Sequence, residues 1–155
     1  MTEYRGKLRA VGSVGIVVST YHERITSRLL EGALATCANA GLGADQLDVV
    51  WVPGAFELGV TAAALARSGR YAAVVALGVV VRGETPHFDF VAGETSRALG
   101  ETARETGVPV GFGLLTVETT SQAVDRAGGV AGNKGAEAAE AAIRTADLLQ
   151  QMVRP

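Results

Sequence analysis

The stretch at residues 82–87, Arg-Gly-Glu-Thr-Pro-His, is the strongest candidate for chemistry and follows the most apolar run of the chain. A histidine is the natural proton-transfer group near neutral pH. Gly83, Glu84 and Thr85 could offer backbone N–H groups and a hydroxyl to an anion, provided that the Glu84 carboxylate points away from it. A lone loop histidine is more often solvated than catalytic, so on pattern alone His87 is a candidate and no more.

A second candidate segment, Pro-Gly-Ala-Phe-Glu at residues 53–57, separates a strand pattern from a helix pattern. Gly54 and Ala55 leave the backbone open to close approach by a ligand. Glu57 either favours the helix dipole or binds hydroxyl groups of a polyol, and the pattern favours the first role. Tyr21 follows the first strand pattern and could stack on a flat ring or pack partly into the core.

The remaining polar residues give weaker signals. Arg126 and Lys134 flank a glycine-rich stretch and could bind phosphate, although surface salt bridges are the more common role of such residues. His22 and His87 lie on different loops without a paired ligand, which argues against a zinc site. The lone Cys37 falls in an apolar helical pattern typical of a buried small hydrophobe. Motifs for a catalytic triad, a dinucleotide or ATP are missing.

The elements that must position these residues alternate between strand and helix patterns. Strands are predicted at 14–18, 47–52, 72–81 and 110–116, and helices at 23–40, 56–66, 89–105, 121–127 and 135–152. Such alternation predicts a four-stranded parallel sheet with helices on both faces, a three-layer αβα architecture. In folds of this class ligands bind beyond the carboxyl ends of the strands, where both candidate segments fall. The glycine-rich residues 128–133 are predicted to be a flexible connection.

Composition suits one soluble domain over residues 1–155, since 48% of the residues are hydrophobic, 19% are charged and the net charge is -2. This balance points to neither nucleic acid nor a membrane as a partner. No apolar run reaches the roughly 18 residues of a spanning helix, and the first residues lack a signal-peptide order, so we expect a cytoplasmic protein. Residues 1–12 form an N-terminal arm. Its weakly strand-like residues 4–10 could pair with the sheet of a neighbouring subunit, and fraying is equally consistent with the pattern.

Four blocks of this sequence, taken together, resemble the lumazine synthase family, which acts at the penultimate step of riboflavin biosynthesis. The blocks are Val-Val-Ser-Thr-Tyr-His at 17–22, Val-Pro-Gly-Ala-Phe-Glu at 52–57, the run from Ala76 to Asp89, and residues 123–128 with 132–135. They occur in the family's order and span nearly the whole chain, and the third is the most specific. The resemblance implies a flavodoxin-like topology whose N-terminal arm pairs with a neighbouring subunit.

The resemblance also implies a reaction that needs neither cofactor nor metal. An amine of 5-amino-6-ribitylaminopyrimidinedione attacks the ketone of 3,4-dihydroxy-2-butanone 4-phosphate and forms an imine. Phosphate is then eliminated, the ring closes and water leaves, which gives 6,7-dimethyl-8-ribityllumazine. Because both reactants are intrinsically reactive, much of the catalysis can come from holding them together.

By position, the resemblance assigns His87 to proton transfer, Arg126 to phosphate binding and Lys134 to a place beside it. It assigns the following to substrate binding, in chain order: Tyr21, Gly54, Ala55, Phe56, Glu57, Val79, Val80, Val81, Gly83, Glu84, Thr85 and Phe112. Tyr21 would stack on the pyrimidine, Glu57 would bind ribityl hydroxyls, and residues 83–85 would face the phosphate. In the family, Phe112, Arg126 and Lys134 reach the site from an adjacent subunit.

Two positions depart from the family's commonest pattern. Gly59 stands where many members have proline, which would loosen the start of the second helix. Tyr21 replaces the more usual phenylalanine or tryptophan, and stacking should survive this change. Neither departure removes a catalytic group.

The family's assembly is a pentamer, and some members join twelve pentamers into an icosahedral shell. The short stretch from Gly128 to Lys134 favours a sixty-subunit shell here, which could enclose riboflavin synthase, with a free pentamer as the alternative. Two other functions stay open: a flavodoxin-like module that binds a flavin or pyrimidine without turnover, and a shell-forming relative with an inactive site. The presence of Glu57, His87, Arg126 and Lys134 disfavours both.

Overall fold

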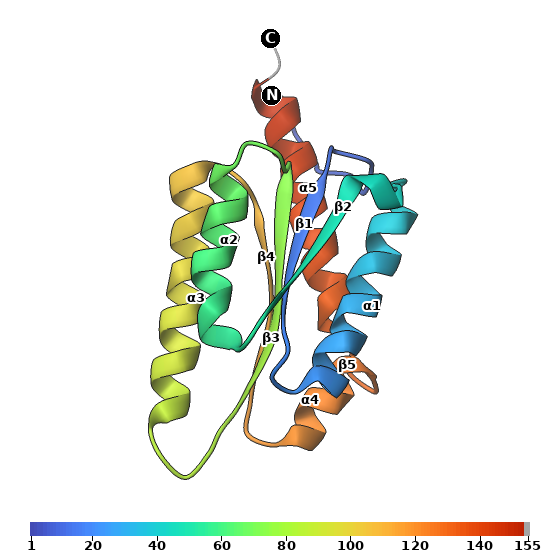
Figure 1. Cartoon of the computed structure of the whole chain (residues 1–155). Coiled ribbons are helices and arrows are strands. Elements are labelled where there is room, and N and C mark those ends of the chain that lie inside the picture. Colours follow the sequence, from blue (N-terminus) through green and yellow to red (C-terminus); the bar gives the residue numbers. More distant parts are fainter. Residues whose placement is uncertain (154–155) are drawn as a thin grey trace.

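A parallel four-stranded sheet forms the centre of the computed structural model, which describes residues 1–153. Its strands are β1 (Val14–Ser19), β2 (Leu47–Val52), β3 (Ala73–Val81) and β4 (Val110–Val117), in the order β2-β1-β3-β4 (Figure 1). Every β1 residue and all but the last β3 residue are buried, as a strand covered on both faces requires. The sheet predicted from the sequence is therefore confirmed.

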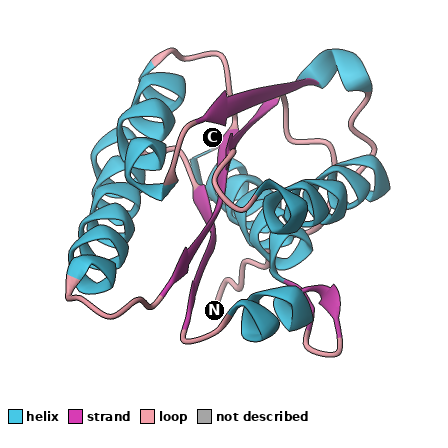
Figure 2. Ribbon diagram, turned by 60° about the horizontal axis from the view of Figure 1, so that its bottom comes forward, coloured by secondary structure: helices cyan, strands magenta, loops and turns pink. Residues whose placement is uncertain are grey.

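Helices cover both faces of this sheet, which gives the expected three layers. Helices α2 (Leu58–Arg67) and α3 (His87–Thr106) pack on one face, and α1 (Glu23–Asn39) and α5 (Lys134–Val153) pack on the other (Figures 1 and 2). Side chains alternate across β1, so that Ile16 and Val18 join the core under α1 and α5 while Val17 joins the core under α2 and α3.

The apolar face predicted for the first helix is confirmed in its main part. Ile25, Leu29, Ala33 and Cys37 are buried, at the spacing of successive helical turns. Burial raises the pKa of the Cys37 thiol to about 11, so the thiol stays protonated near neutral pH. This is the small buried hydrophobe that the sequence indicated.

Two helix starts differ from the prediction. Helix α3 begins at His87 rather than at residue 89, so His87 is the first residue of a helix and not part of a loop. Helix α2 begins at Leu58 because the preceding residues form a separate 3₁₀ turn, η2 (Ala55–Glu57). A second such turn, η1 (Ala44–Gln46), precedes β2.

The glycine-rich stretch is an ordered hairpin, so the prediction of a flexible connection is wrong. After α4 (Thr120–Arg126), strands β5 (Ala127–Gly129) and β6 (Gly132–Asn133) pair antiparallel. Gly128 and Gly132 adopt φ angles of 95° and 83°, which glycine reaches at little cost. The Asn133 side chain donates to the Arg28 carbonyl and accepts from the first amides of α5, which fixes the hairpin between two helices.

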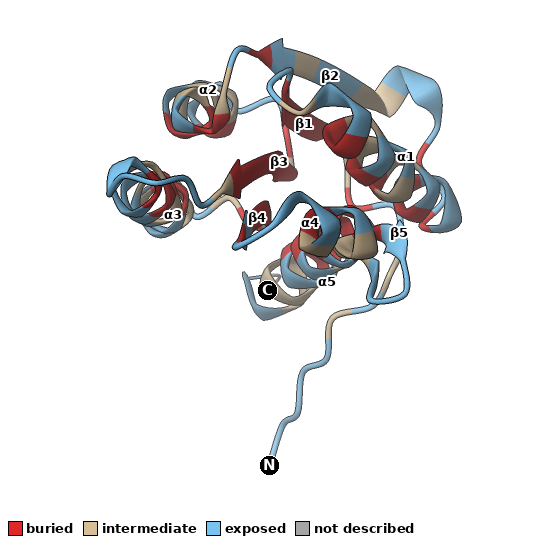
Figure 3. Cartoon of the chain, turned by 90° about the horizontal axis from the view of Figure 1, so that it is seen from below, coloured by how far each residue is buried: buried red, intermediate tan, exposed pale blue. Residues whose placement is uncertain are grey.

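The N-terminal arm lies against α5 of its own chain and forms no strand within the described residues. The buried Asp147 carboxylate accepts hydrogen bonds from the Lys7 amide at 2.7 Å and from the Arg9 guanidinium. Gln150 and Gln151 donate to the carbonyls of Val11 and Arg5, and these bonds attach the second half of the arm. The first residues are exposed and project away from the sheet (Figure 3).

None of the helices in residues 1–153 combines the length and the apolar character that crossing a bilayer requires.

Candidate active site

A cavity of about 750 Å³ opens at the carboxyl ends of the strands, beside α2 and α3. This is the end of the sheet toward which Figure 3 looks. Nine of the predicted site residues line it: Tyr21, Gly54, Ala55, Phe56, Glu57, Val79, Val80, Val81 and His87. They come from three segments that follow or end β1, β2 and β3, as the rule for parallel sheets predicts.

Backbone hydrogen bonds hold the first two of these segments together. The amides of Thr20 and Tyr21 donate to the carbonyls of Val52 and Pro53, at 2.8 and 3.0 Å. The Thr20 hydroxyl donates to the Pro53 carbonyl as well, at 3.1 Å. Because the chain after β1 is tied to the chain after β2, Tyr21 lies beside the segment that carries Glu57.

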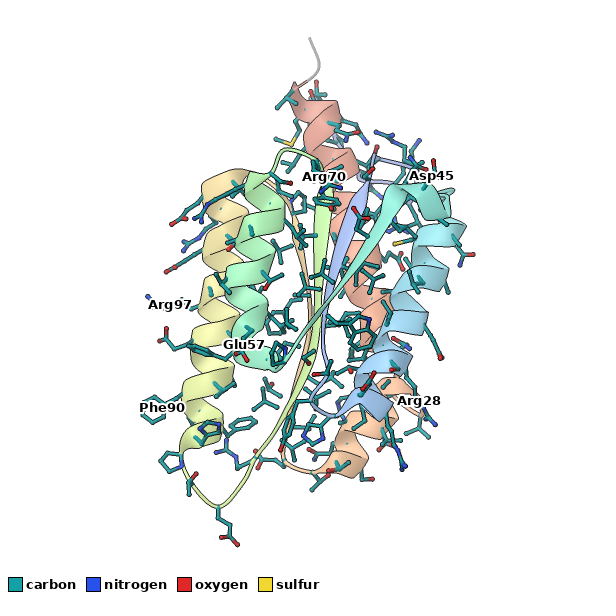
Figure 4. All side chains as sticks on the ribbon, in the orientation of Figure 1. Arg28, Asp45, Glu57, Arg70, Phe90 and Arg97 are labelled. Atoms are coloured by element: carbon teal, nitrogen blue, oxygen red, sulfur yellow. The ribbon has the colours of Figure 1, made fainter. Side chains whose placement is uncertain are left out.

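Glu57 is half-buried at the end of η2, where the chain turns into α2 (Figure 4). Its amide donates to the Gly54 carbonyl at 3.2 Å, and the Thr95 hydroxyl of α3 donates to the Ala55 carbonyl at 3.4 Å. The turn is thus fixed to the neighbouring helix. A carboxylate on this turn lines the cavity and can accept hydrogen bonds from hydroxyl groups.

Gly59 lies in the first turn of α2, where its missing side chain has a packing role. A Cβ at this position would stand 2.9 Å from the Cβ of Ala98 in α3, closer than side chains approach one another. Glycine therefore lets α2 and α3 come close together behind the cavity wall. The loosened helix start expected at this position stays untested.

Tyr21 and His22 meet edge to face, with ring centroids 4.5 Å apart and planes at 64°. The Tyr21 side chain is otherwise exposed, which leaves one ring face free for a flat ligand. His22 also lines the cavity and is the one non-glycine residue with positive φ among residues 1–153.

Four lining residues were not predicted: His22, Phe90, Val91 and Glu94. The last three lie on α3 at three, four and seven positions after His87, the spacing of one helical face. The signal was present in the sequence, but a helix start placed at residue 89 separated His87 from this face. Phe90 projects from α3 on the side away from the sheet (Figure 4) and is largely exposed.

A second cavity, of about 250 Å³, lies along the edge strand β4 beside the end of α4 and the start of α5. Phe112, Arg126 and Lys134 line it, and it shares no lining residue with the first. Arg126 donates to the Gln122 carbonyl at 3.0 Å, and Lys134 pairs with Glu137 at 3.1 Å. Two half-buried cations beside a small cavity suit an anion such as phosphate.

Gly83, Glu84 and Thr85 line neither cavity and are exposed on the loop between β3 and α3. A Cβ added at Gly83 would meet no atom within 4 Å, so this part of the loop stands clear of the chain. Within the described residues the structure therefore does not bring this loop to Arg126 or Lys134.

Arg82 anchors the base of that loop, a role that the sequence did not indicate. Its amide donates to the Val117 carbonyl at 2.9 Å, and its guanidinium pairs with Glu118 at 2.9 Å and Asp89 at 3.3 Å. The same group lies 4.3 Å from the centroid of the Phe88 ring. The hydrogen bond to Glu118 raises the pKa of Arg82 above its usual value. Arg82 thus links the ends of β3 and β4 to the first turn of α3, where His87 lies.

No group of three or more His, Cys, Asp or Glu side chains in the part of the chain that the structure describes is arranged to hold a metal ion. One side-chain polar atom of that part, the Ser19 hydroxyl at the end of β1, is buried without a hydrogen-bond partner.

Comparison with known proteins joins these observations. The family model described as 6,7-dimethyl-8-ribityllumazine synthase matches residues 12–150, which include both cavities and exclude most of the arm. The protein named 6,7-dimethyl-8-ribityllumazine synthase of Gemmatimonas aurantiaca is 49% identical over 152 residues, 97% of this chain and 93% of its own length. With both cavities lined by the residues that the resemblance singled out, the chain belongs to the 6,7-dimethyl-8-ribityllumazine synthase family.

Proposed function

We propose that this chain is a lumazine synthase, which condenses 5-amino-6-ribitylaminopyrimidinedione with 3,4-dihydroxy-2-butanone 4-phosphate and releases phosphate and water. The observation that carries the proposal is the convergence of Tyr21, Glu57 and His87 on one cavity in a member of this family. An aromatic side chain can stack on a flat ring, a carboxylate can bind the hydroxyls of a polyol, and an imidazole can transfer a proton.

The pyrimidine substrate occupies the large cavity in this proposal. Its ring stacks on Tyr21, and the strand end at residues 79–81 provides an apolar wall. The Glu57 carboxylate accepts hydrogen bonds from ribityl hydroxyls, because the half-buried turn holds it in the cavity wall.

His87 transfers protons during the reaction. Imine formation takes a proton from the attacking amine and gives one to the departing hydroxyl, and ring closure repeats that exchange. A single imidazole can serve both steps, since it is able to accept and donate near neutral pH. Its position at the start of α3, close in sequence to the loop at residues 83–85, supports a role between the ring and the expected phosphate side.

The phosphate of the second substrate binds Arg126 and Lys134 of a neighbouring subunit, with Gly83, Glu84 and Thr85 opposite them. What supports a shared site is the separation of the two cavities on one chain. A cation that stabilises a leaving phosphate must be close to the reacting carbon, and the first cavity has no lysine or arginine in its lining. The neighbouring copy supplies them.

The unit of assembly in this proposal is a pentamer. The short hairpin favours twelve pentamers joined into a sixty-subunit shell, with the free pentamer as the alternative. Such a shell would enclose riboflavin synthase as a cargo. The arm would pair with the sheet of the neighbour. Each subunit contributes a single domain over residues 1–155, and the cytoplasm is the compartment expected from the sequence, which cell fractionation would test. Light scattering distinguishes a free pentamer from a shell, because their masses differ twelvefold.

Turnover is tested by mixing the purified chain with both substrates and following the absorbance of the lumazine. We expect a rate well above the uncatalysed background. A rate equal to background, together with tight binding of the pyrimidine, would favour the non-catalytic binding module. A shell that binds neither substrate would favour an inactive structural relative.

A further inference from the structure

His22 occupies a backbone conformation that a side chain makes costly. Its φ of 61° and ψ of 44° lie in the left-handed region, where glycine is the residue of least strain. Strained residues persist where the surrounding structure demands them, and they cluster at ligand sites. A histidine at a position where glycine would be less strained indicates that the imidazole makes a contribution that glycine could not.

The surrounding chain shows why the turn itself is needed. The carbonyl of His22 accepts hydrogen bonds from the amides of Ile25 and Thr26, which begins α1. The Thr26 hydroxyl donates to the Ser19 carbonyl at 2.7 Å, so the helix start is tied to the end of β1. The chain must therefore reverse between Ser19 and Glu23, and the left-handed residue makes that reversal.

The imidazole is not used to cap the helix, because no side-chain capping bond forms at this position. It lies instead against Tyr21, 4.5 Å between ring centroids, and lines the large cavity. Tyr21 is 68% exposed, so its side chain has few other contacts that restrain its rotamer. The one close aromatic neighbour found for it among residues 1–153 is His22.

We infer that His22 is a positioning residue, whose imidazole holds the Tyr21 ring in the orientation that stacks on the pyrimidine. The inference rests on the proposed function of the cavity and adds a residue to which the family resemblance assigned no role. Edge-to-face pairs of this geometry contribute an interaction that corresponds to roughly 2- to 10-fold in a binding constant. Loss of the imidazole should therefore weaken the binding of the pyrimidine substrate and not that of the butanone phosphate.

The test compares His22→Gly and His22→Asn, two variants that tolerate the left-handed backbone but lack the imidazole. We expect both to raise KM for the pyrimidine roughly 2- to 10-fold and to leave KM for the butanone phosphate within about twofold. The thermal midpoint of His22→Gly should equal or exceed that of the wild type, since strain is relieved. Glu23→Gln, at the adjacent exposed position outside the cavity lining, serves as the control.

A double-mutant cycle separates positioning from a general structural role. In a Tyr21→Ala background, His22→Gly should leave KM for the pyrimidine unchanged, because the ring that it restrains is gone. An unchanged pyrimidine KM in both single variants, equal changes in both KM values, or additive effects with Tyr21→Ala would overturn the inference. Turnover by the wild type tests the proposed function. The ratio of the pyrimidine KM of the variants to that of the wild type tests the role of His22. A failure of one proposal can therefore be told from a failure of the other.

Discussion

The two cavities that predicted site residues line differ in chemistry as well as in size. The larger, at the mouth formed by β1, β2 and β3, contains aromatic rings, two imidazoles and two carboxylates and has no lysine or arginine in its lining. The smaller, along β4, contains Arg126 and Lys134 and has no acidic side chain in its lining. One suits a flat ring with a polyol tail, and the other suits an anion. The difference teaches that the predicted ring-binding residues and the predicted phosphate-binding residues lie in separate cavities of one chain, as the shared site proposed above requires.

The position of β4 explains the division. As the outer strand of the sheet, it has one side occupied by β3 and the other open, and the small cavity lies along it. The two cationic residues therefore lie at an outer edge of the sheet. The shared site proposed above predicts that an isolated chain is inactive, which links activity to assembly.

Arg126→Ala should have the largest effect, because it removes the charge that would stabilise the leaving phosphate. We expect a loss of about 100-fold in kcat/KM for the butanone phosphate, within the range seen for preorganised charge stabilisation. Steady-state kinetics with the second substrate varied would measure it. Arg104→Ala, an exposed position on α3, is the control. Unchanged kinetics in Arg126→Ala would remove the phosphate role.

The proposed division of the site between chains can be tested directly by mixing two variants of low activity. Co-assembly of His87→Ala with Arg126→Ala subunits in equal amounts should create sites in which both halves are intact. Random mixing predicts recovery of roughly one quarter of the wild-type activity. If the mixture is no more active than the two variants measured separately, each site belongs to one chain. The two cavities are then not halves of one shared site.

His87→Ala should cost less, about 10- to 100-fold in kcat, because the two reactants remain held together. The KM values should change little, since the imidazole is expected to act in proton transfer rather than in binding. Rapid-mixing absorbance of lumazine formation would measure the step. A complete loss of turnover would mean that proton transfer, and not proximity, dominates in the large cavity.

Arg82→Met tests whether the link between the two strand ends matters to the site. The methionine keeps an unbranched apolar side chain but removes the guanidinium, and with it the pairs with Glu118 and Asp89 and the contact with the Phe88 ring. We expect a change of a few-fold in kcat/KM, because exposed ion pairs are weak and act here through the placement of His87. The same substitution at Arg104 gives the matched control. A change as large as that of Arg126→Ala would instead place Arg82 in contact with substrate.

Asp147 lines neither of the two predicted-site cavities but a third one between the arm and α5, so Asp147→Asn should leave the activity of assembled protein unchanged while lowering stability. The Lys7 amide, with help from Arg9 and Gln151, lowers the pKa of Asp147 below the 3.8 of an ordinary aspartate. The ionised form therefore stabilises the fold above about pH 4, by about 1–3 kcal/mol, and this contribution is lost as the pH falls through the folded-state pKa. Denaturant unfolding should show a wild-type advantage at pH 7 that narrows below pH 4. A constant difference across this range would contradict the assignment.

Much of the fold followed from the sequence because its signal is local. The all-apolar run that became β3 and the period of α1 each need only neighbouring residues to be recognised. The hairpin β5–β6 was missed because it depends on glycines at positive φ and on Asn133, whose side chain bonds to a residue far away in sequence. Local composition alone made that stretch resemble a loose linker.

The site residues that could be predicted from the sequence lie in the blocks that resemble the family, at or after the ends of strands. The links made by Arg82 and the contact between His22 and Tyr21 were not predicted, because they depend on side chains meeting in three dimensions. Phe90 and Glu94 could have been predicted from the sequence but were missed. Their helical spacing from His87 was visible, and an error of two residues in the start of α3 hid it.

The bonds between the arm and α5 have a consequence for the order of folding. Lys7 meets Asp147 and Arg5 meets Gln151, contacts that span 140 and 146 residues. Contacts between the two ends of a chain form late, since almost the whole loop between them must close first. During synthesis Lys7 therefore leaves the ribosome 140 residues before Asp147, on which it docks. A chain that lacks the end of α5 cannot hold its arm in the orientation seen here.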